Sequence, residues 1–442
     1  MADSVALATR LELDDLDGIA PLWEGDVAVV GGGSAGSSAA VASARYGART
    51  LLVEGAGFLG GTGAAVLDTF YGFFAPGAAD RVVGGIGWEL CERLIADDQA
   101  FLRPNTYGAG TGVTYEPDHL KYLWDDLTLS AGVTTLLHTT ARAVVVDGGR
   151  LVGVVLATRG GSHWVKAHTF VDSSGDADLA WYAGAALEMP SVDQKLQPLT
   201  ATFRLGNVEV AKVKTADLHE HMREAAAAGD YDLPRREGSV HRTVLPGVVH
   251  TNLTRVRGVD ATDPWALSNA EREGRLQILE YTRFLKDRVP GFEDSYLIST
   301  GVRIGVRETR RLRGEYVLTR EDVMSARDFP DAIARCGAPL EDHDGGDSTV
   351  WEYIGGDEPN GKTYGVPFRS LLPREVEGLV VAGRCLSATH DAHASVRSMA
   401  QCMATGQAAG TAAAMSSGSQ TQVRDVDPSA LRESLKQQGV LL

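Results

Sequence analysis

Residues 27–36, with the sequence VAVVGGGSAG, constrain the fold of this chain more than any other stretch. An apolar run of strand length leads directly into a G-x-G-x-x-G turn, an arrangement typical of dinucleotide-binding folds. Each glycine answers a separate need: the chain turns sharply at Gly31, the backbone approaches a pyrophosphate at Gly33, and a helix packs tightly on a sheet at Gly36. The alternative is an ordinary glycine-rich turn between a strand and a helix.

The segments that follow the turn favour the dinucleotide site. Residues 37–46 are rich in alanine and suit a helix close to a sheet, and the amides at its start, around Ser34 and Ala35, are expected to face the phosphates. A second strand is expected at 50–53, ending at Glu54. A carboxylate about 20 residues beyond the glycines can accept both hydroxyls of an adenosine ribose.

The charge and composition of the chain exclude several classes of partner. The 442 residues include 42 basic and 58 acidic ones, a formal net charge of −16, which argues against nucleic acid and anionic membrane surfaces as partners. Residues 1–23 carry acids where a secretory peptide is basic and then apolar, and no apolar run is long enough to cross a bilayer, so a cytoplasmic protein is expected. The four cysteines lie far apart, without a C-x-x-C pair, so we expect no disulfide framework.

A second glycine-rich loop, residues 55–64 with the sequence GAGFLGGTGA, is expected to bring backbone close to a ligand. Together with the strand, turn, helix and Glu54 before it, this loop resembles the FAD-binding start of the glutathione-reductase-like flavoproteins. There the second loop lies along the flavin side of FAD. The resemblance implies FAD contacts at Gly55, Gly60, Gly61, Thr62 and Gly63.

Strands expected at 140–146, 151–157 and 164–170, with glycine turns between them, form a β-meander. In the flavoproteins that the chain resembles, such a meander interrupts the nucleotide domain, and the chain then returns to the cofactor. The resemblance therefore implies FAD contacts at Ala143, Gly175 and Asp176. For Gly175 and Asp176 a simple turn is the alternative.

From residue 187 to 369 the pattern changes to short strands and amphipathic helices, the latter expected at 211–228 and 270–289, and we expect a substrate-binding domain here. Residues 303–313 hold five arginines. Their planar forks can bind a carboxylate or phosphate, or the arginines can be neutralised by Glu308 and Glu315 as structural ion pairs. By helical spacing, only some of the five can share one face.

Residues 379–414 read as a buried strand that ends in Gly383 and Arg384, then a polar loop, then a helix of small residues. Here the chain resembles the bacterial FAD-dependent oxidoreductase family, within the succinate dehydrogenase and fumarate reductase flavoprotein superfamily. The stretches 307–319, 382–390 and 395–410 carry the resemblance. It implies FAD contacts at Gly383, Arg384, Arg397 and Gly406.

This resemblance implies an α/β fold: a Rossmann-like FAD-binding domain, with a central parallel sheet and a β-meander, and an inserted α+β substrate domain. The expected divisions are residues 24–186 and 370–418 for the FAD-binding domain, 187–369 for the substrate domain and 419–442 for a helical tail. In related flavoproteins with covalent FAD, a histidine often precedes the second glycine-rich loop. This chain has Phe58 and Leu59 there, so noncovalent FAD is expected.

By resemblance, the substrate gives a hydride to flavin N5 while a protein base removes a proton. His390 is the first candidate for that base, because imidazole titrates near neutral pH; the alternative is a histidine that only hydrogen-bonds the cofactor or the loop. Arg307 and Arg311 are predicted to orient the polar end of the substrate. Further substrate contacts are predicted at Tyr353, Tyr364 and His393, and no metal site is expected.

The leading functional interpretation is a dehydrogenase or oxidase acting on a small polar metabolite, and the chain is a possible homo-oligomer. A flavin monooxygenase that uses transient NAD(P)H is the first alternative. The second alternative belongs to another class, an FAD-bearing RNA-modification or interaction protein, against which the acidic charge balance argues.

Overall fold

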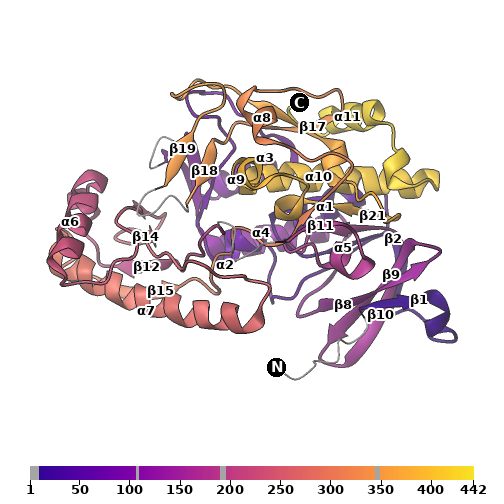
Figure 1. Ribbon diagram of the computed structural model, residues 1–442, viewed down its shortest axis with the longest axis horizontal. Coiled ribbons are helices and arrows are strands. Elements are labelled where there is room, and N and C mark those ends of the chain that lie inside the picture. The colour runs from indigo at the N-terminus through magenta and orange to yellow at the C-terminus, as the bar shows by residue number, and fades with distance from the viewer. Residues whose placement is uncertain (1–8, 106–108, 190–195, 344–348) are drawn as a thin grey trace.

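The computed structural model describes residues 9–105, 109–189, 196–343 and 349–442 (Figure 1). Its main sheet has eight strands in the order β1-β8-β9-β10-β2-β3-β7, with β21 also paired to β10. These strands are β1 (Arg10–Glu12), β2 (Trp23–Val30), β3 (Thr50–Val53), β7 (Thr134–Leu136), β8 (Thr140–Asp147), β9 (Arg150–Thr158), β10 (Gly161–Asp172) and β21 (Leu379–Val381).

The central part of this sheet is parallel, as the sequence predicts. β2 pairs in parallel with β3 and with β10, and β3 pairs in parallel with β7. β21 pairs in parallel with β10, on the side of β10 that faces away from β2. The strand β3 is buried along its whole length, and so are the last four residues of β2. Near-continuous apolar runs of this kind form strands that are covered on both faces.

The expected β-meander is also confirmed. β8 pairs antiparallel with β9, and β9 antiparallel with β10. Because β10 has 12 residues, its first half closes the meander and its second half lies beside β2 in the parallel sheet. The meander therefore adjoins the parallel sheet through one shared strand.

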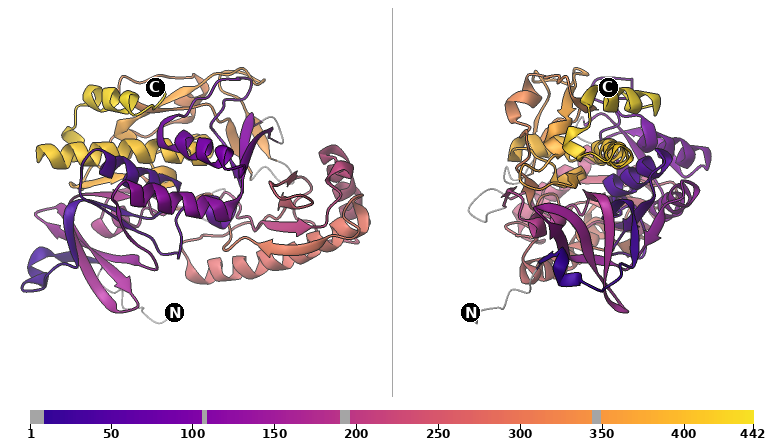
Figure 2. Two further views of the ribbon diagram at one scale, coloured as in Figure 1. Left: turned by 180° about the vertical axis from the view of Figure 1, so that it is seen from behind. Right: turned by 90° about the vertical axis from the view of Figure 1, so that its right-hand side faces the viewer.

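Two helices cover one side of the parallel sheet with almost no space between them. These are α1 (Ser34–Arg45) and α10 (Met399–Ser419), and the long α10 runs through the middle of the molecule (Figures 1 and 2). A Cβ at Gly406 would lie 2.0 Å from the Ala35 carbonyl oxygen, and one at Gly410 would lie 2.0 Å from that of Ala39. The small residues of α10 are thus required by backbone contact with α1.

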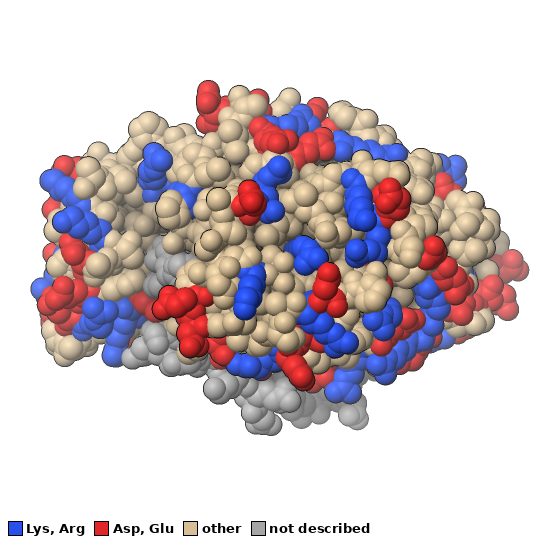
Figure 3. Space-filling model, turned by 90° about the horizontal axis from the view of Figure 1, so that it is seen from above, with Lys and Arg blue, Asp and Glu red and all other residues tan. Residues whose placement is uncertain are grey.

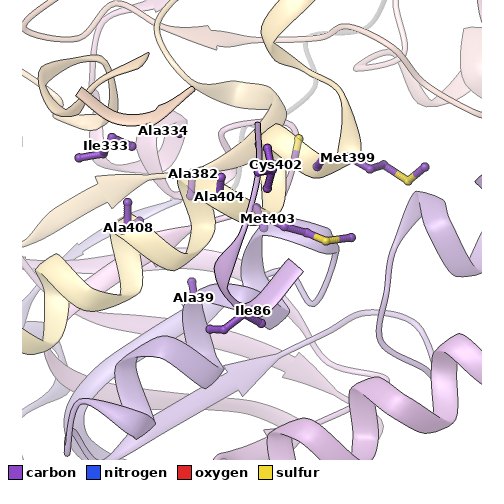
Figure 4. Packing of buried hydrophobic residues seen from close by; sticks show 14 of the residues in the cluster. Ala39, Ile86, Ile333, Ala334, Ala382, Met399, Cys402, Met403, Ala404 and Ala408 are labelled. Carbon is purple, nitrogen blue, oxygen red and sulfur yellow. The ribbon is translucent and has the colours of Figure 1, made fainter. Parts of the chain in front are cut away.

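The same helix anchors the largest hydrophobic core. Figure 4 shows Met399, Cys402, Met403, Ala404 and Ala408 of α10 between Ala39 of α1, Ile86 of α3 (Gly85–Ala96) and Ile333 with Ala334 of β17 (Ala332–Cys336). The core extends to α4 (Pro117–Ser130) and to α11 (Pro428–Gln437), whose Leu431 and Leu435 are buried. Around it lie α2 (Thr62–Ala65), β4 (Thr69–Phe70), β5 (Ala100–Pro104), β6 (Thr111–Tyr115), α8 (Arg320–Met324), α9 (His390–Val396), β18 (Leu340–Asp342), β19 (Val350–Glu352) and β20 (Tyr364–Pro367).

A smaller sheet in the order β13-β14-β12-β15 lies at the other end of the molecule, beside the long helix α7 (Pro264–Arg288) (Figure 1). It has its own hydrophobic core, to which α6 (Thr215–Ala228) contributes Leu218 and Met222. Its strands are β12 (Phe203–Gly206), β13 (Ser239–Arg242), β14 (Val249–Asn252) and β15 (Tyr296–Thr300); α5 (Asp178–Ala183), β11 (Leu187–Glu188) and β16 (Arg311–Leu312) lie nearer the main sheet. The domain boundaries expected from the sequence stay a prediction.

Two local expectations are wrong. The expected polar loop at 386–397 contains the helix α9, because Thr389 Oγ1 accepts the Ala392 amide and caps it while Ala392, Ala394 and Val396 are buried. The arginine-rich segment 303–313 is not helical, since its only regular element is the short strand β16. Helical spacing therefore does not decide which arginines share a face.

Within the described ranges, every helix is too short or too polar to cross a membrane. The face seen in Figure 3 carries acidic and basic side chains side by side, without a large area of one sign.

Candidate FAD and substrate site

One cavity of about 470 Å³ runs from the end of β3 to the smaller sheet. At one end it is lined by Val53, Glu54 and Gly55, in the middle by the turn after β2 and the start of α10, and at the other end by Arg235, Arg307 and Glu341. The residues that line the cavity therefore come from many elements that are far apart in the sequence.

Backbone contacts bring four separate loops to the middle of the cavity. The Gly60 amide donates to the Gly32 carbonyl at 2.8 Å, which joins the two glycine-rich loops. Ser173 Oγ donates to the Gly31 carbonyl at 2.8 Å, and the Ala382 amide donates to the Asp172 carbonyl at 2.9 Å. The loops after β2, β3, β10 and β21 thus meet at the carboxyl ends of parallel strands, where open α/β sheets bind ligands.

The glycines at the two ends of the first turn, Gly31 and Gly36, are required by close backbone contacts. Gly31 has a φ of +99°, and a Cβ there would lie 2.4 Å from the Ser173 carbonyl oxygen. A Cβ at Gly36 would lie 1.7 Å from the Gly31 carbonyl oxygen, so Gly36 serves helix packing and does not line the cavity. Gly33, Ser34 and Ala35 line the cavity at the N-terminus of α1.

Glu54 lies at the end of β3 and lines the cavity. Its carboxylate accepts the Gly32 and Ala56 amides, each at 2.6 Å, which fixes its orientation. Thr139, Thr140 and Ala141 line the same end of the cavity, whereas Ala143 does not: its side chain is buried in a small core on the meander. The sequence thus predicted the correct strand, β8, but the cavity is lined by Ala141, two residues before Ala143.

The predicted contacts at Gly175, Gly383 and Arg384 all line the cavity. Arg384 is held by Asp176, at 2.9 Å, and by Thr309 Oγ1, at 3.2 Å. The charge of Arg384 and the hydroxyl of Thr309 outweigh the burial of Asp176 and lower the pKa of its carboxyl. Asp176 itself does not line the cavity, so it orients Arg384 there.

The second glycine-rich loop is divided between the cavity and packing. Gly55, Gly61 and Thr62 line the cavity. A Cβ at Gly61 would lie 2.7 Å from the Gly33 Cα, so the two loops approach at backbone distance. Gly60 and Gly63 do not line the cavity; a Cβ at Gly63 would meet the Tyr115 hydroxyl at 2.9 Å. Gly406 likewise packs on α1 and not on the cavity.

These residues fit FAD on grounds of chemistry as well as shape. The amides at the start of α1 and the charge of Arg384 suit a pyrophosphate, and Glu54 suits a ribose. Arg397 also lines the cavity, and its buried Nη1 has no hydrogen-bond partner among the described residues. An unpaired buried guanidinium nitrogen favours an acceptor supplied by a ligand.

The fold and the cavity together define a flavoprotein of the Rossmann-like class. The chain belongs to the FAD dependent oxidoreductase family, whose model matches residues 26–435. The protein is therefore an enzyme that uses FAD.

Several solved structures are similar to this chain at low sequence identity. A geranylgeranyl bacteriochlorophyll reductase-like protein from Thermoplasma acidophilum has 15% identity and a TM-score of 0.47, covering 94% of this chain and 83% of the other. The p-nitrophenol 4-monooxygenase PnpA from Pseudomonas putida DLL-E4 has 10% identity and a TM-score of 0.49, with coverages of 94% and 84%. The flavin-dependent brominase Bmp2 has 14% identity and a TM-score of 0.48, with coverages of 94% and 83%. No curated protein matches the sequence. Likenesses this distant say nothing about the reaction of this chain.

The far end of the cavity is rich in arginine. Arg235, Arg303, Arg307 and Arg397 line it. Burial, with the nearby charges of Arg397 and Arg235, lowers the pKa of Arg307 to about 9, and burial lowers that of Arg397 to about 10. Arg303 is exposed and makes no hydrogen bond or ion pair with the described residues. Guanidiniums gathered in this way favour an anionic ligand.

An acid and a histidine lie among these arginines. Glu341 and His343 both line the cavity, and Glu341 Oε1 is 2.9 Å from His343 Nε2. Tyr71, from the segment after β4, lines the cavity as well, and burial raises its pKa. The sequence offered no motif for these three residues, because Tyr71 and the segment of Glu341 and His343 lie far apart in the sequence and only the fold brings them together.

The predicted base His390 lies outside the residues that line the cavity. Its Nδ1 is 3.0 Å from the Glu308 carboxylate, and burial lowers its pKa. Arg311 forms an ion pair with the same Glu308 and donates to the Ala388 carbonyl at 3.0 Å, so it is also held away from the cavity. Arg307, in contrast, lines the cavity as expected.

The other three predicted substrate contacts do not line the cavity either. His393 is fully buried and donates from Nε2 to the Arg384 carbonyl at 2.7 Å, which holds the backbone at that cavity residue. Tyr364 is fully buried, with its hydroxyl 2.9 Å from Ser395 Oγ. Tyr353 follows β19, whose Trp351 lines the cavity instead. Their substrate roles stay predictions that the geometry does not favour.

Proposed function

We propose that this enzyme is a dehydrogenase or oxidase that oxidises a small organic anion, most simply a carboxylate. The observation that carries the proposal is the single cavity in which residues suited to FAD continue into an end lined by Arg235, Arg303, Arg307 and Arg397. When bound, FAD supplies an acceptor for the hydride that leaves a substrate C–H bond.

The residues of the chain have separate tasks in this proposal. Glu54, the start of α1 and Arg384 hold the dinucleotide, while Arg307 and Arg397 bind and orient the anion. Arg307 Nη1 already donates to the Pro198 carbonyl at 2.5 Å and to Thr200 Oγ1 at 2.6 Å, so the guanidinium is held in one position before substrate arrives. A fixed guanidinium loses less freedom on binding than a mobile one.

Two finer expectations belong to this proposal. The noncovalent attachment of FAD and the placement in the succinate dehydrogenase and fumarate reductase flavoprotein superfamily rest on sequence resemblance. The monooxygenase alternative also stays open, because the arginines can hold an aromatic or aliphatic acid for hydroxylation. No contact in the described structure favours the RNA-related alternative.

The test begins with the visible spectrum of the purified protein and identification of the flavin released by acid. The holoenzyme is then mixed without oxygen with a panel of small 2-hydroxy and 2-amino acids, and with the matching amides as uncharged controls. We expect bleaching of the flavin by one or more acids and not by their amides.

Bleaching by the amides alone would contradict the anion proposal. Oxidation of NAD(P)H with incorporation of oxygen into a carboxylate would favour the monooxygenase alternative. A colourless protein that FAD cannot reconstitute would contradict the site described above.

A further inference from the structure

A chain of polar side chains leads away from the arginine-rich end of the cavity. Glu341 Oε1 is 2.9 Å from His343 Nε2, and His343 Nδ1 is 3.0 Å from Thr349 Oγ1. Thr349 then donates to the Glu237 carboxylate from both its hydroxyl, at 2.6 Å, and its amide, at 2.7 Å. Four side chains from three segments thus lie in one continuous row of polar contacts.

Glu341 and His343 both line the cavity, and Glu341 is the more open of the two. The Glu341 side chain is 35% exposed, whereas that of His343 is 6% exposed. Both ring nitrogens of His343 are already engaged, one with Glu341 and one with Thr349. A molecule in the cavity therefore reaches the Glu341 carboxylate more readily than the His343 ring.

The charges around the pair decide its resting state. Although burial alone would raise it, the pKa of Glu341 is lowered to about 2 by His343, Arg397 and Arg307. Burial lowers the pKa of His343 to about 3, and the charges of Arg307 and Arg235 act in the same direction. At neutral pH Glu341 is a carboxylate that accepts a hydrogen bond from His343 Nε2, and its other oxygen can accept a proton.

We propose that Glu341 is the base that takes the substrate's proton, and that His343 is a positioning residue that orients this carboxylate and links it to Thr349 and Glu237. The inference rests on the proposed function. The substrate group is H–C–O–H or H–C–N–H: its C–H electron pair leaves as a hydride to FAD, the oxidant. Its O–H or N–H proton forms a bond to a Glu341 oxygen, and the product gains a C=O or C=N bond.

The arginines give this base a second property. They lower its pKa while the cavity holds no anion, and a bound carboxylate offsets their charge. Anion binding therefore raises the pKa of Glu341 and makes it a stronger base in the substrate complex. Among the residues that the structure describes, the charged or titratable groups that act on it are His343, Arg307, Arg397 and Tyr71.

The first test measures binding, independently of turnover. Acetate is titrated calorimetrically into the FAD-loaded wild-type protein and into Glu341→Gln, with Asp342→Asn as the matched control. The Asp342→Asn substitution removes the same charge at the neighbouring residue, and the Asp342 side chain does not line the cavity. Since Glu341 repels a bound anion, we expect Glu341→Gln to bind acetate about tenfold more tightly, and Asp342→Asn to bind it within about threefold of wild type.

The second test follows flavin bleaching in a single turnover with glycolate, or with whichever panel acid bleaches fastest. Wild-type rates should fall as the pH is lowered through the pKa of Glu341 in the complex, because a protonated carboxyl accepts no further proton. Glu341→Gln should bleach about 100-fold more slowly and without that limb, while Glu341→Asp should recover part of both.

Three results would contradict one or the other claim. Unchanged or weaker acetate binding by Glu341→Gln overturns the assignment of Glu341, as does bleaching at the wild-type rate; either leaves the anion site standing. If acetate binds neither wild type nor Glu341→Gln, and no panel acid bleaches the flavin, the proposed function fails as well.

Discussion

Five neighbouring arginines in the chain have different roles in the fold. Arg303 and Arg307 line the cavity. Arg310 pairs with Asp178, Arg311 with Glu308 and Arg313 with Glu188. The two interpretations that the sequence left open, ligand contact and structural ion pairing, thus apply to different members of one cluster. Whether an arginine lines the cavity or pairs with an acidic side chain depends on the non-helical backbone of this segment. The spacing of the arginines in the sequence does not reveal that backbone conformation.

Replacement of Arg307 by methionine should weaken anion binding by about 10- to 100-fold, because a charged, buried hydrogen-bond donor is lost. The measurement is the acetate dissociation constant of the FAD-loaded protein. Arg313→Met is the matched control, since Arg313 is exposed and pairs with Glu188. Equal effects of the two substitutions would contradict a direct role for Arg307.

His390→Ala should leave the pH dependence of flavin bleaching unchanged. His390 is hydrogen-bonded to Glu308 and does not line the cavity. A shift of the pH profile in this variant, with Glu341→Gln unaffected, would restore His390 as the base that the sequence predicts.

At the scale of elements, the sequence predicted well what is local. The strand, turn and helix at 23–45, the acid at the end of β3, the meander and the helix α11 all lie where their patterns place them. Glycines in these motifs indicate close backbone contacts with neighbouring segments, and such contacts can be predicted without a structure. Gly63 and Gly406 show the limit, because a glycine required by packing looks the same in sequence as one required by a ligand.

What the sequence could not give was the other end of the cavity. Tyr71, Arg235 and the pair Glu341 and His343 come from three segments without a shared motif. Each is an ordinary residue in its local context, and only long-range packing of the smaller sheet against the FAD-binding part brings them to one place. His390 was preferred because it lies in sequence between residues expected to bind the cofactor. That criterion does not indicate where the side chain points.

The contact between α1 and α10 gives a prediction at the same scale. Gly406→Ala should lower the unfolding free energy by roughly 1–3 kcal/mol and weaken FAD binding, because the new Cβ would lie 2.0 Å from the Ala35 carbonyl oxygen. Thermal unfolding and FAD titration check both effects. Gly418→Ala, in the same helix with no atom within 4 Å of its Cβ, is the control and should be neutral or slightly stabilising. Similar losses in both variants would contradict the close packing.

At the scale of the whole molecule, buried histidines should make the fold sensitive to acid. Burial lowers the pKa of His250 to about 4. Between the ordinary histidine value of about 6.5 and about 4, the unfolded chain takes up a proton that the folded chain does not, so stability falls as the pH is lowered through that window. This one group contributes about 3 kcal/mol of that loss.

The unfolding free energy measured in urea at several pH values checks this expectation. His250→Gln should show a shallower decline between about pH 6.5 and 4 than wild type. His163→Gln, a substitution of an exposed histidine in the meander, should follow the wild-type curve. Parallel curves for wild type and His250→Gln would contradict the role of His250.

The way α10 lies on α1 also bears on how the protein is made. Residues that line the nucleotide end of the cavity run from Val30 to Cys402, and β21 enters the main sheet only beside β10. During synthesis the glycine-rich turn leaves the ribosome long before Arg384 and α10 exist. The nascent chain therefore cannot form the complete FAD site described here until α10 has been translated, and stable loading of the cofactor should follow that point.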